Sequence, residues 1–438
     1  MIARARRLLR SLADAFWVLP AAIVVILAGL GLLVVEIQIW GALPDWLPSD
    51  WIYGGGETGA RTLLGAVASS TIGVAGTLFS ITIAALSLAS SQMGPRLLRN
   101  FVRDRGNQVT LGVLLGTFAY ALIVLRSVRG GEENPFVPSL GVTLGLALSG
   151  ACIALMIYFV HHVATRINVD TVIDLVHDDI QRDIDRLTSP AGEADATPPI
   201  DLDWRGAGEV RFEASGYLQQ IDAAGLAEWA AEHGTTIRLL IRPGQFVYPG
   251  AAIALVCPPV EGARKALHDG TALSAQGGSP GDLTYPVLQL VEVAVRALSP
   301  GINDPRTAIS VLDRLGGALA GIASRELRSG VIQHEGEPRL LIPALTYGDV
   351  LQAMFPMIRQ AAGRTPAVLL HLMAVLNAVA GVERRDERLS ALRRTAEEVV
   401  EEARVGFVNR FDLEALDAAH RAFLATIASR SSATVVEC

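Results

Sequence analysis

A stripe of small and hydroxyl-bearing residues follows one side of residues 62–91, a stretch of about 30 residues without a charge. At about 100° per residue, its members fall within roughly a quarter of the helical wheel. Hydroxyl groups can line water or ions, and small residues let helix backbones approach closely. The pattern therefore allows two interpretations, tight packing inside a helix bundle or the lining of a conduction path. The stripe comprises Ser69, Gly73, Gly76, Thr77, Ser80, Ala84, Ser87 and Ser91.

Positive charge gathers directly after this stretch, at Arg96, Arg99, Arg103 and Arg105. A ring of arginines raises the local anion concentration, so these residues are candidates for the mouth of an anion-preferring or weakly selective pore. The alternative role is topological, because arginines at the cytoplasmic end of a span fix its orientation and contact lipid headgroups.

A second polar motif lies in the C-terminal half, where Leu298-Ser-Pro-Gly-Ile-Asn-Asp-Pro305 separates two amphipathic runs. Asp304 followed by Pro305 is the ordinary start signal of a helix, with an N-cap and a proline in the first turn. Capping does not account for the length of the motif. Asn303, Asp304 and Arg306 therefore also form a candidate ligand-binding or subunit-interface turn.

The chain lacks the patterns that enzymes use. We find no phosphate-binding glycine loop, no nucleophile elbow and no His or Cys spacing for a metal, and we predict neither catalysis, nor a cofactor, nor a metal site. His161 and His162 are adjacent and point to different sides of a helix, so they suit a membrane edge better than a metal. With 37 basic and 44 acidic residues the net charge is −7, which argues against nucleic-acid binding.

The elements that carry the stripe are predicted to be membrane spans. The chain has 438 residues, 51% of them apolar, and its mean hydropathy is +0.38. Runs at about 16–35, 62–91, 109–125 and 138–160 are each long enough to cross a bilayer. Arginines precede the first run and follow the second, so both termini are predicted to be cytoplasmic in a bacterial inner membrane protein.

Four segments follow from this pattern: a four-span domain at 1–165, an amphipathic helix and linker at 166–208, a small β-rich module at 209–258 and a helical domain at 259–438. The fold class is an α-helical membrane protein with a cytoplasmic α+β region. The β-rich module resembles the small barrel-sandwich domains that include lipoyl and biotinyl carriers. It holds no lysine, so a swinging-arm cofactor is not expected.

Three motifs in order also resemble a known family: Phe79 through Ser90-Ser-Gln-Met-Gly-Pro-Arg96, Tyr158-Phe-Val-His-His162 and Ala297 through Pro305. They are similar to the bacterial predicted membrane proteins grouped as domain-of-unknown-function family 2254. The resemblance covers nearly the whole chain and implies four N-terminal spans with a cytoplasmic part. It implies no activity.

Two functions agree with these observations. In the first, the chain forms a homo-oligomeric channel for small ions, and the stripe lines its pore because four helices are too few to enclose a wide one. In the second, the spans anchor a cytoplasmic sensor or partner-binding scaffold that does not conduct.

Overall fold

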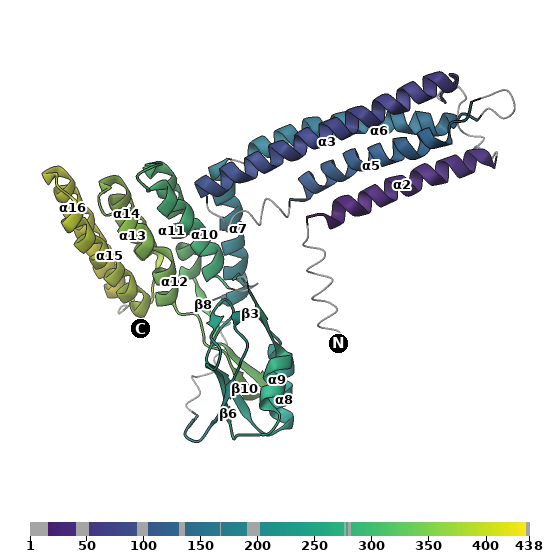
Figure 1. Cartoon of the computed structure of the whole chain (residues 1–438). Coiled ribbons are helices and arrows are strands. Elements are labelled where there is room, and N and C mark those ends of the chain that lie inside the picture. The colour runs from purple at the N-terminus through teal and green to yellow at the C-terminus, as the bar shows by residue number, and fades with distance from the viewer. Residues whose placement is uncertain are drawn as a thin grey trace. The chain divides into compact units, whose positions relative to one another are not determined.

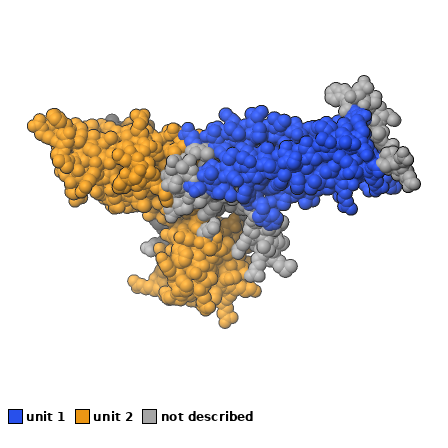
Figure 2. Space-filling view, turned by 45° about the horizontal axis from the view of Figure 1, so that its top comes forward, with its two compact units in different colours: residues 1–168 blue, residues 169–438 orange. Residues whose placement is uncertain are grey.

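The computed structural model describes residues 16–40, 52–93, 104–130, 136–166, 168–190, 202–275, 277–278 and 282–434. The chain separates into two compact units, Met1–Asn168 and Val169–Cys438 (Figure 2). Arg96, Arg99 and Arg103 lie outside the described residues.

The first unit contains four long apolar helices, as predicted (Figure 1). Each is long and apolar enough to cross a membrane. The second is longer than the predicted span and begins at Glu57, just after Gly54, Gly55 and Gly56. The four helices are α2 (Val18–Ile39), α3 (Glu57–Met93), α5 (Arg105–Ser127) and α6 (Ser139–Arg166).

Helix α5 contacts each of the other three helices and is the most buried of them. Gly112 and Gly116 face α2, and a Cβ added at Gly112 would lie 3.0 Å from the Pro20 Cα atom. The two glycines are about one helical turn apart, and their lack of a side chain lets the backbones of α5 and α2 approach closely. Tyr120 is fully buried, and its hydroxyl donates to the Gly141 carbonyl of α6 at 2.9 Å. The middle of the four-helix bundle is therefore filled by α5.

The second unit has a helical part in which α11 packs on α7 and α10, and α14 packs on α11, α15 and α16 (Figure 1). Pro356 begins α13 directly after Phe355, so two short helices and not one continuous helix lie at 347–361. The helices of this part are α7 (Val169–Leu187), α10 (Thr284–Ala297), α11 (Pro305–Ala323), α12 (Tyr347–Met354), α13 (Pro356–Ala361), α14 (Pro366–Val382), α15 (Asp386–Gly406) and α16 (Arg410–Thr434).

A buried ion pair joins these helices. The Arg388 guanidinium lies 3.4 Å from the Glu383 carboxylate, with side-chain exposures of 8% and 0%. Arg388 also donates to the Ile322 and Arg325 carbonyls, at 3.0 Å each. Ile322 lies in the last turn of α11, where carbonyls lack a following turn of helix to accept from, and Arg325 lies two residues beyond the helix. The guanidinium therefore caps the end of α11 and holds the segment that follows it.

The rest of the second unit is built on β-strands. A five-stranded sheet has the order β2-β6-β4-β10-β9, and a three-stranded sheet has the order β5-β3-β7. Helices α8 (Ala223–Glu232) and α9 (Ala263–Gly270) complete the module, and β1 (Thr188–Pro190) pairs with β8 (Arg325–Leu327). The remaining strands are β2 (Gly208–Arg211), β3 (Gly216–Ile221), β4 (Thr236–Leu239), β5 (Phe246–Val247), β6 (Ala252–Cys257), β7 (Thr271–Ser274), β9 (Val331–His334) and β10 (Glu337–Leu341).

This β module differs from the predicted one. The strands β9 and β10 come from the segment expected to be helical, and β10 pairs in parallel with β4. A division after residue 258 therefore does not separate the β-strands from the helices, and the barrel-sandwich resemblance is not confirmed. The turn between β9 and β10 is formed by Glu335 and Gly336, both with positive φ, which is the geometry of a two-residue hairpin. Pairing between strands that are distant in the chain cannot be predicted from the pattern of neighbouring residues.

Candidate functional site

Helix α3 carries the predicted stripe, and its buried side is apolar except for Thr71, whose hydroxyl donates to the Val67 carbonyl at 2.8 Å. Leu64, Val67, Ala75 and Leu78 are buried in the four-helix bundle. Glu57 in the first turn suits the positive end of the helix dipole. The uncharged run and its apolar side therefore explain both the helix and its attachment to α5 and α6.

The stripe lies on the opposite side of α3. Ser80 is about 160° around the helix from the buried Leu78. A Cβ added at Gly73 or Gly76 would find no atom within 4 Å. In the structure, the stripe therefore does not pack against the other three apolar helices of the same chain. The stripe residues whose side chains are described are all exposed: Ser69, Gly73, Gly76, Thr77, Ser80, Ala84 and Ser87. Ser91 belongs to α3, but its side chain is outside the description.

Hydroxyl groups of the stripe hydrogen-bond to the helix that carries them. The Ser80 hydroxyl donates to the Gly76 carbonyl at 3.0 Å, and the Thr77 hydroxyl donates to the Gly73 carbonyl at 3.1 Å. Each oxygen keeps its lone pairs available to an outside donor or cation. The stripe is thus weakly polar, with little steric bulk and no charge, and the exposed apolar side chains of Ile72 and Ile83 lie on the same helix beside it.

Of the four arginines predicted at a pore mouth, the structure describes Arg105, which is exposed at the first residue of α5. Its neighbour Asp104 caps the same helix by accepting from the Gly106 amide at 2.8 Å. The other three arginines are not described, so the proposed ring of positive charge stays a prediction.

A polar cluster that the sequence reasoning missed joins the ends of α5 and α6. His162 Nε2 lies 2.8 Å from Asp104 Oδ2, and the Tyr158 hydroxyl lies 3.3 Å from His162 Nδ1. In a neutral imidazole, Nε2 donates to the carboxylate and Nδ1 accepts from Tyr158. The cluster explains one of the two adjacent histidines as a link between two spans. An acidic residue just before an apolar run was the available signal.

The motif between α10 and α11 is explained by helix ends. Asn303 has φ 50°, and the Asp304 amide donates to the Ala297 carbonyl at 2.7 Å. The Asp304 carboxylate accepts from the Arg306 and Thr307 amides and from the Thr307 hydroxyl. That hydroxyl holds the pKa of Asp304 below its ordinary value. The N-cap prediction is confirmed, and termination of α10 accounts for the length of the motif.

Asn303 and Arg306 are exposed beside this cap. Arg306 has no ion pair within the part of the chain that the structure describes. The candidate ligand or interface role of this turn therefore stays a prediction. Within the described ranges, no three His, Cys, Asp or Glu side chains are grouped to hold a metal ion.

Comparisons with known proteins agree with this architecture. A family model described as "Predicted membrane protein (DUF2254)" matches residues 13–378. An uncharacterized protein of Mycobacterium tuberculosis (strain CDC 1551 / Oshkosh) is 34% identical over 400 residues, which cover 87% of this chain and 74% of that protein. An uncharacterized protein of Mycobacterium bovis (strain ATCC BAA-935 / AF2122/97) has the same identity and coverage. No solved structure matches the chain. The resemblance noted from the three motifs is confirmed, and the chain belongs to the family of predicted membrane proteins grouped as domain of unknown function 2254.

Proposed function

We propose that several copies of this membrane protein assemble into an ion channel whose pore is lined by the outward stripe of α3. The observation that carries the proposal is the exposure of the stripe on the side of α3 opposite to the bundle. No described part of its own chain covers this weakly polar surface, so it faces lipid, another copy or water. Water is the partner that best suits a row of hydroxyls and exposed backbone.

A path through the middle of one chain has little support. Tyr120, Thr117 and Leu114 of α5 fill the bundle and are almost entirely buried. A cavity between α3, α5 and α6 has a volume of about 10 Å³, which is close to the minimum for a single water. A conduction path therefore needs more than one copy of the chain.

Selectivity would come from the end of the pore that carries Arg105 and its three arginine neighbours. The stripe has no charge, so it discriminates little between ions. Positive charge at the mouth raises the local anion concentration, and we expect weak or anion-preferring selectivity. The alternative, an anchored sensor or scaffold without conduction, gains no specific support from the turn at Asn303 because capping accounts for its hydrogen bonds.

The test uses the full chain in planar bilayers, with Ser80→Cys and its neighbour Ile81→Cys compared at nearly the same depth. Charged thiosulfonate reagents should reduce the current of Ser80→Cys and leave Ile81→Cys unchanged, because Ile81 lies about 100° around the helix. The unmodified chain serves as the control for its own cysteines. Arg105→Glu should shift the reversal potential toward cation permeation.

Two results would contradict the proposal. One is silent bilayers with protein that is folded and oligomeric by native mass spectrometry. The other is equal modification of the current at positions 80 and 81, which would mean that the stripe does not face the permeation path.

A further inference from the structure

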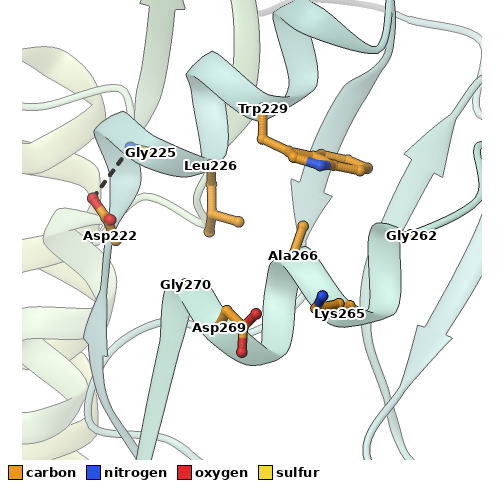
Figure 3. Close-up of a pocket in the computed structure, with 9 residues that line it drawn as sticks. All are labelled: Asp222, Gly225, Leu226, Trp229, Gly262, Lys265, Ala266, Asp269 and Gly270. Carbon is orange, nitrogen blue, oxygen red and sulfur yellow. Dashed lines mark hydrogen bonds between the residues drawn. The ribbon is translucent and has the colours of Figure 1, made fainter. Parts of the chain in front are cut away.

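A groove lies between α8 and α9 of the β module, far along the sequence from the spans (Figure 3). Its volume is about 420 Å³, within the range of small-molecule sites. The face of α8 that lines the groove carries Asp222, Leu226 and Trp229, and the face of α9 carries Lys265 and Asp269. Each set follows the three- and four-residue spacing of one helical side.

The two helices run in opposite directions. The Asp222 amide at the start of α8 donates to the Gly270 carbonyl at the end of α9, at 2.8 Å. At the other end, a Cβ on Gly262 would lie 3.7 Å from the Trp229 ring. Leu226 sits over Gly270, where a Cβ would come within 2.8 Å of its side chain. Because Gly270 has no side chain, the Leu226 side chain fits there and forms the apolar floor of the groove.

Opposite charges stand at the two ends of this groove. Trp229 and Lys265 occupy one end, and Asp222 and Asp269 occupy the other (Figure 3). Lys265 and Asp269 are four residues apart on α9, which separates them by about 6 Å along the helix axis. The Asp269 carboxylate lies 3.6 Å from the imidazole of its neighbour His268. Among the described residues, no ion pair within 4 Å involves Lys265 or Asp222. The Asp222 carboxylate also serves as the N-cap of α8, because its Oδ1 accepts from the Gly225 amide at 3.1 Å. The groove thus offers an ammonium, two carboxylates and an aromatic wall.

From this arrangement we propose that the groove binds a small zwitterion with the length of a dipeptide. The amino group of the ligand would face Asp222 and Asp269, its carboxylate would face Lys265, and an apolar side chain would lie on Trp229 and Leu226. Two extended residues span about 7 Å, which matches the charge separation, whereas one amino acid spans about half of that. The proposal is independent of conduction, because none of these residues belongs to the spans.

The experiment is isothermal titration of the full chain in nanodiscs with four probes. These are alanyl-leucine, leucine, alanyl-alanyl-leucine, and alanyl-leucine with an acetylated amino group and an amidated carboxylate. Alanyl-leucine should bind with a Kd on the order of 1 mM or tighter, as expected for a ligand of this size. The other three should bind at least about tenfold more weakly because each loses one charge contact or both.

Charge-removing variants then locate the site. Lys265→Gln and Asp269→Asn should each weaken alanyl-leucine binding by about tenfold. Arg264→Gln, next to Lys265 on α9 but outside the groove, should leave it unchanged. Circular dichroism checks that these exposed substitutions keep the fold.

Three outcomes would overturn the proposal. They are no heat from alanyl-leucine at several times the expected Kd, equal binding of the charged and blocked dipeptides, and equal loss in Arg264→Gln and Lys265→Gln. A silent channel with intact dipeptide binding would contradict the proposed function alone.

Discussion

At the scale of single residues, the Asp304 carboxylate makes most of the hydrogen bonds that start α11. It caps α11 through two amides, and the Thr307 hydroxyl donates to it. We expect Asp304→Ala to lower the free energy of unfolding by about 1 kcal/mol, the usual cost of losing an N-cap. Thermal unfolding of the full chain in detergent measures this loss, and the exposed Glu228→Ala is the control.

The lowered pKa of Asp304 also predicts how the stability of the fold changes with pH. Its pKa is lowered in the folded chain by the Thr307 hydroxyl, so ionised Asp304 stabilises the fold above its ordinary pKa of about 3.9. That stabilisation is lost as the pH falls through the lower folded value. Asp304→Asn can still cap the helix, so its deficit against the natural chain should shrink between about pH 5 and pH 2. A deficit that stays constant with pH would mean that the charge does not matter.

At the scale of elements, the close approach of α2 and α5 depends on glycine. A Cβ at Gly112 would lie 2.9 Å from Ile23 and 3.0 Å from the Pro20 backbone, which cannot move aside as a flexible side chain can. We expect Gly112→Val to cost about 1–3 kcal/mol, the range for overpacking. Gly150→Val on α6 is the matched control, since a Cβ there meets no atom within 4 Å.

Thermal stability in detergent, followed by the loss of soluble monodisperse protein, distinguishes the two variants. Gly112→Val should have the lower midpoint. Equal midpoints would show that α2 is not held by this contact, and the central position of α5 would then lose its significance for the pore argument.

At the scale of the whole molecule, four helices that each cross the membrane would bring both ends of the first unit to the same side. The arginine pattern predicts that this side is the cytoplasm. In a background without the native cysteines, Gly54→Cys before α3 should react with an impermeant maleimide on intact cells. Glu228→Cys on α8 should react only after permeabilisation. Both positions are exposed, so access alone does not separate them. The reverse pattern would invert the orientation.

Much of this architecture can be read from local sequence. The four spans follow from uncharged runs that match the thickness of a bilayer, and the start of α11 follows from Asp304 and Pro305. Family membership follows from three motifs in order. In each case the physical cause acts over a few neighbouring residues, or between the chain and its solvent.

Tertiary structure alone decided which side of α3 is buried. The stripe with Ser80 and the side with Leu78 were both suited to packing, and only the positions of α5 and α6 assign the bundle to Leu78. The parallel pairing of β10 with β4 and the meeting of Lys265 with Trp229 were decided in the same way. The physical reason is that burial and long-range pairing are properties of surfaces brought together by folding, whereas helix periodicity and capping are properties of adjacent residues.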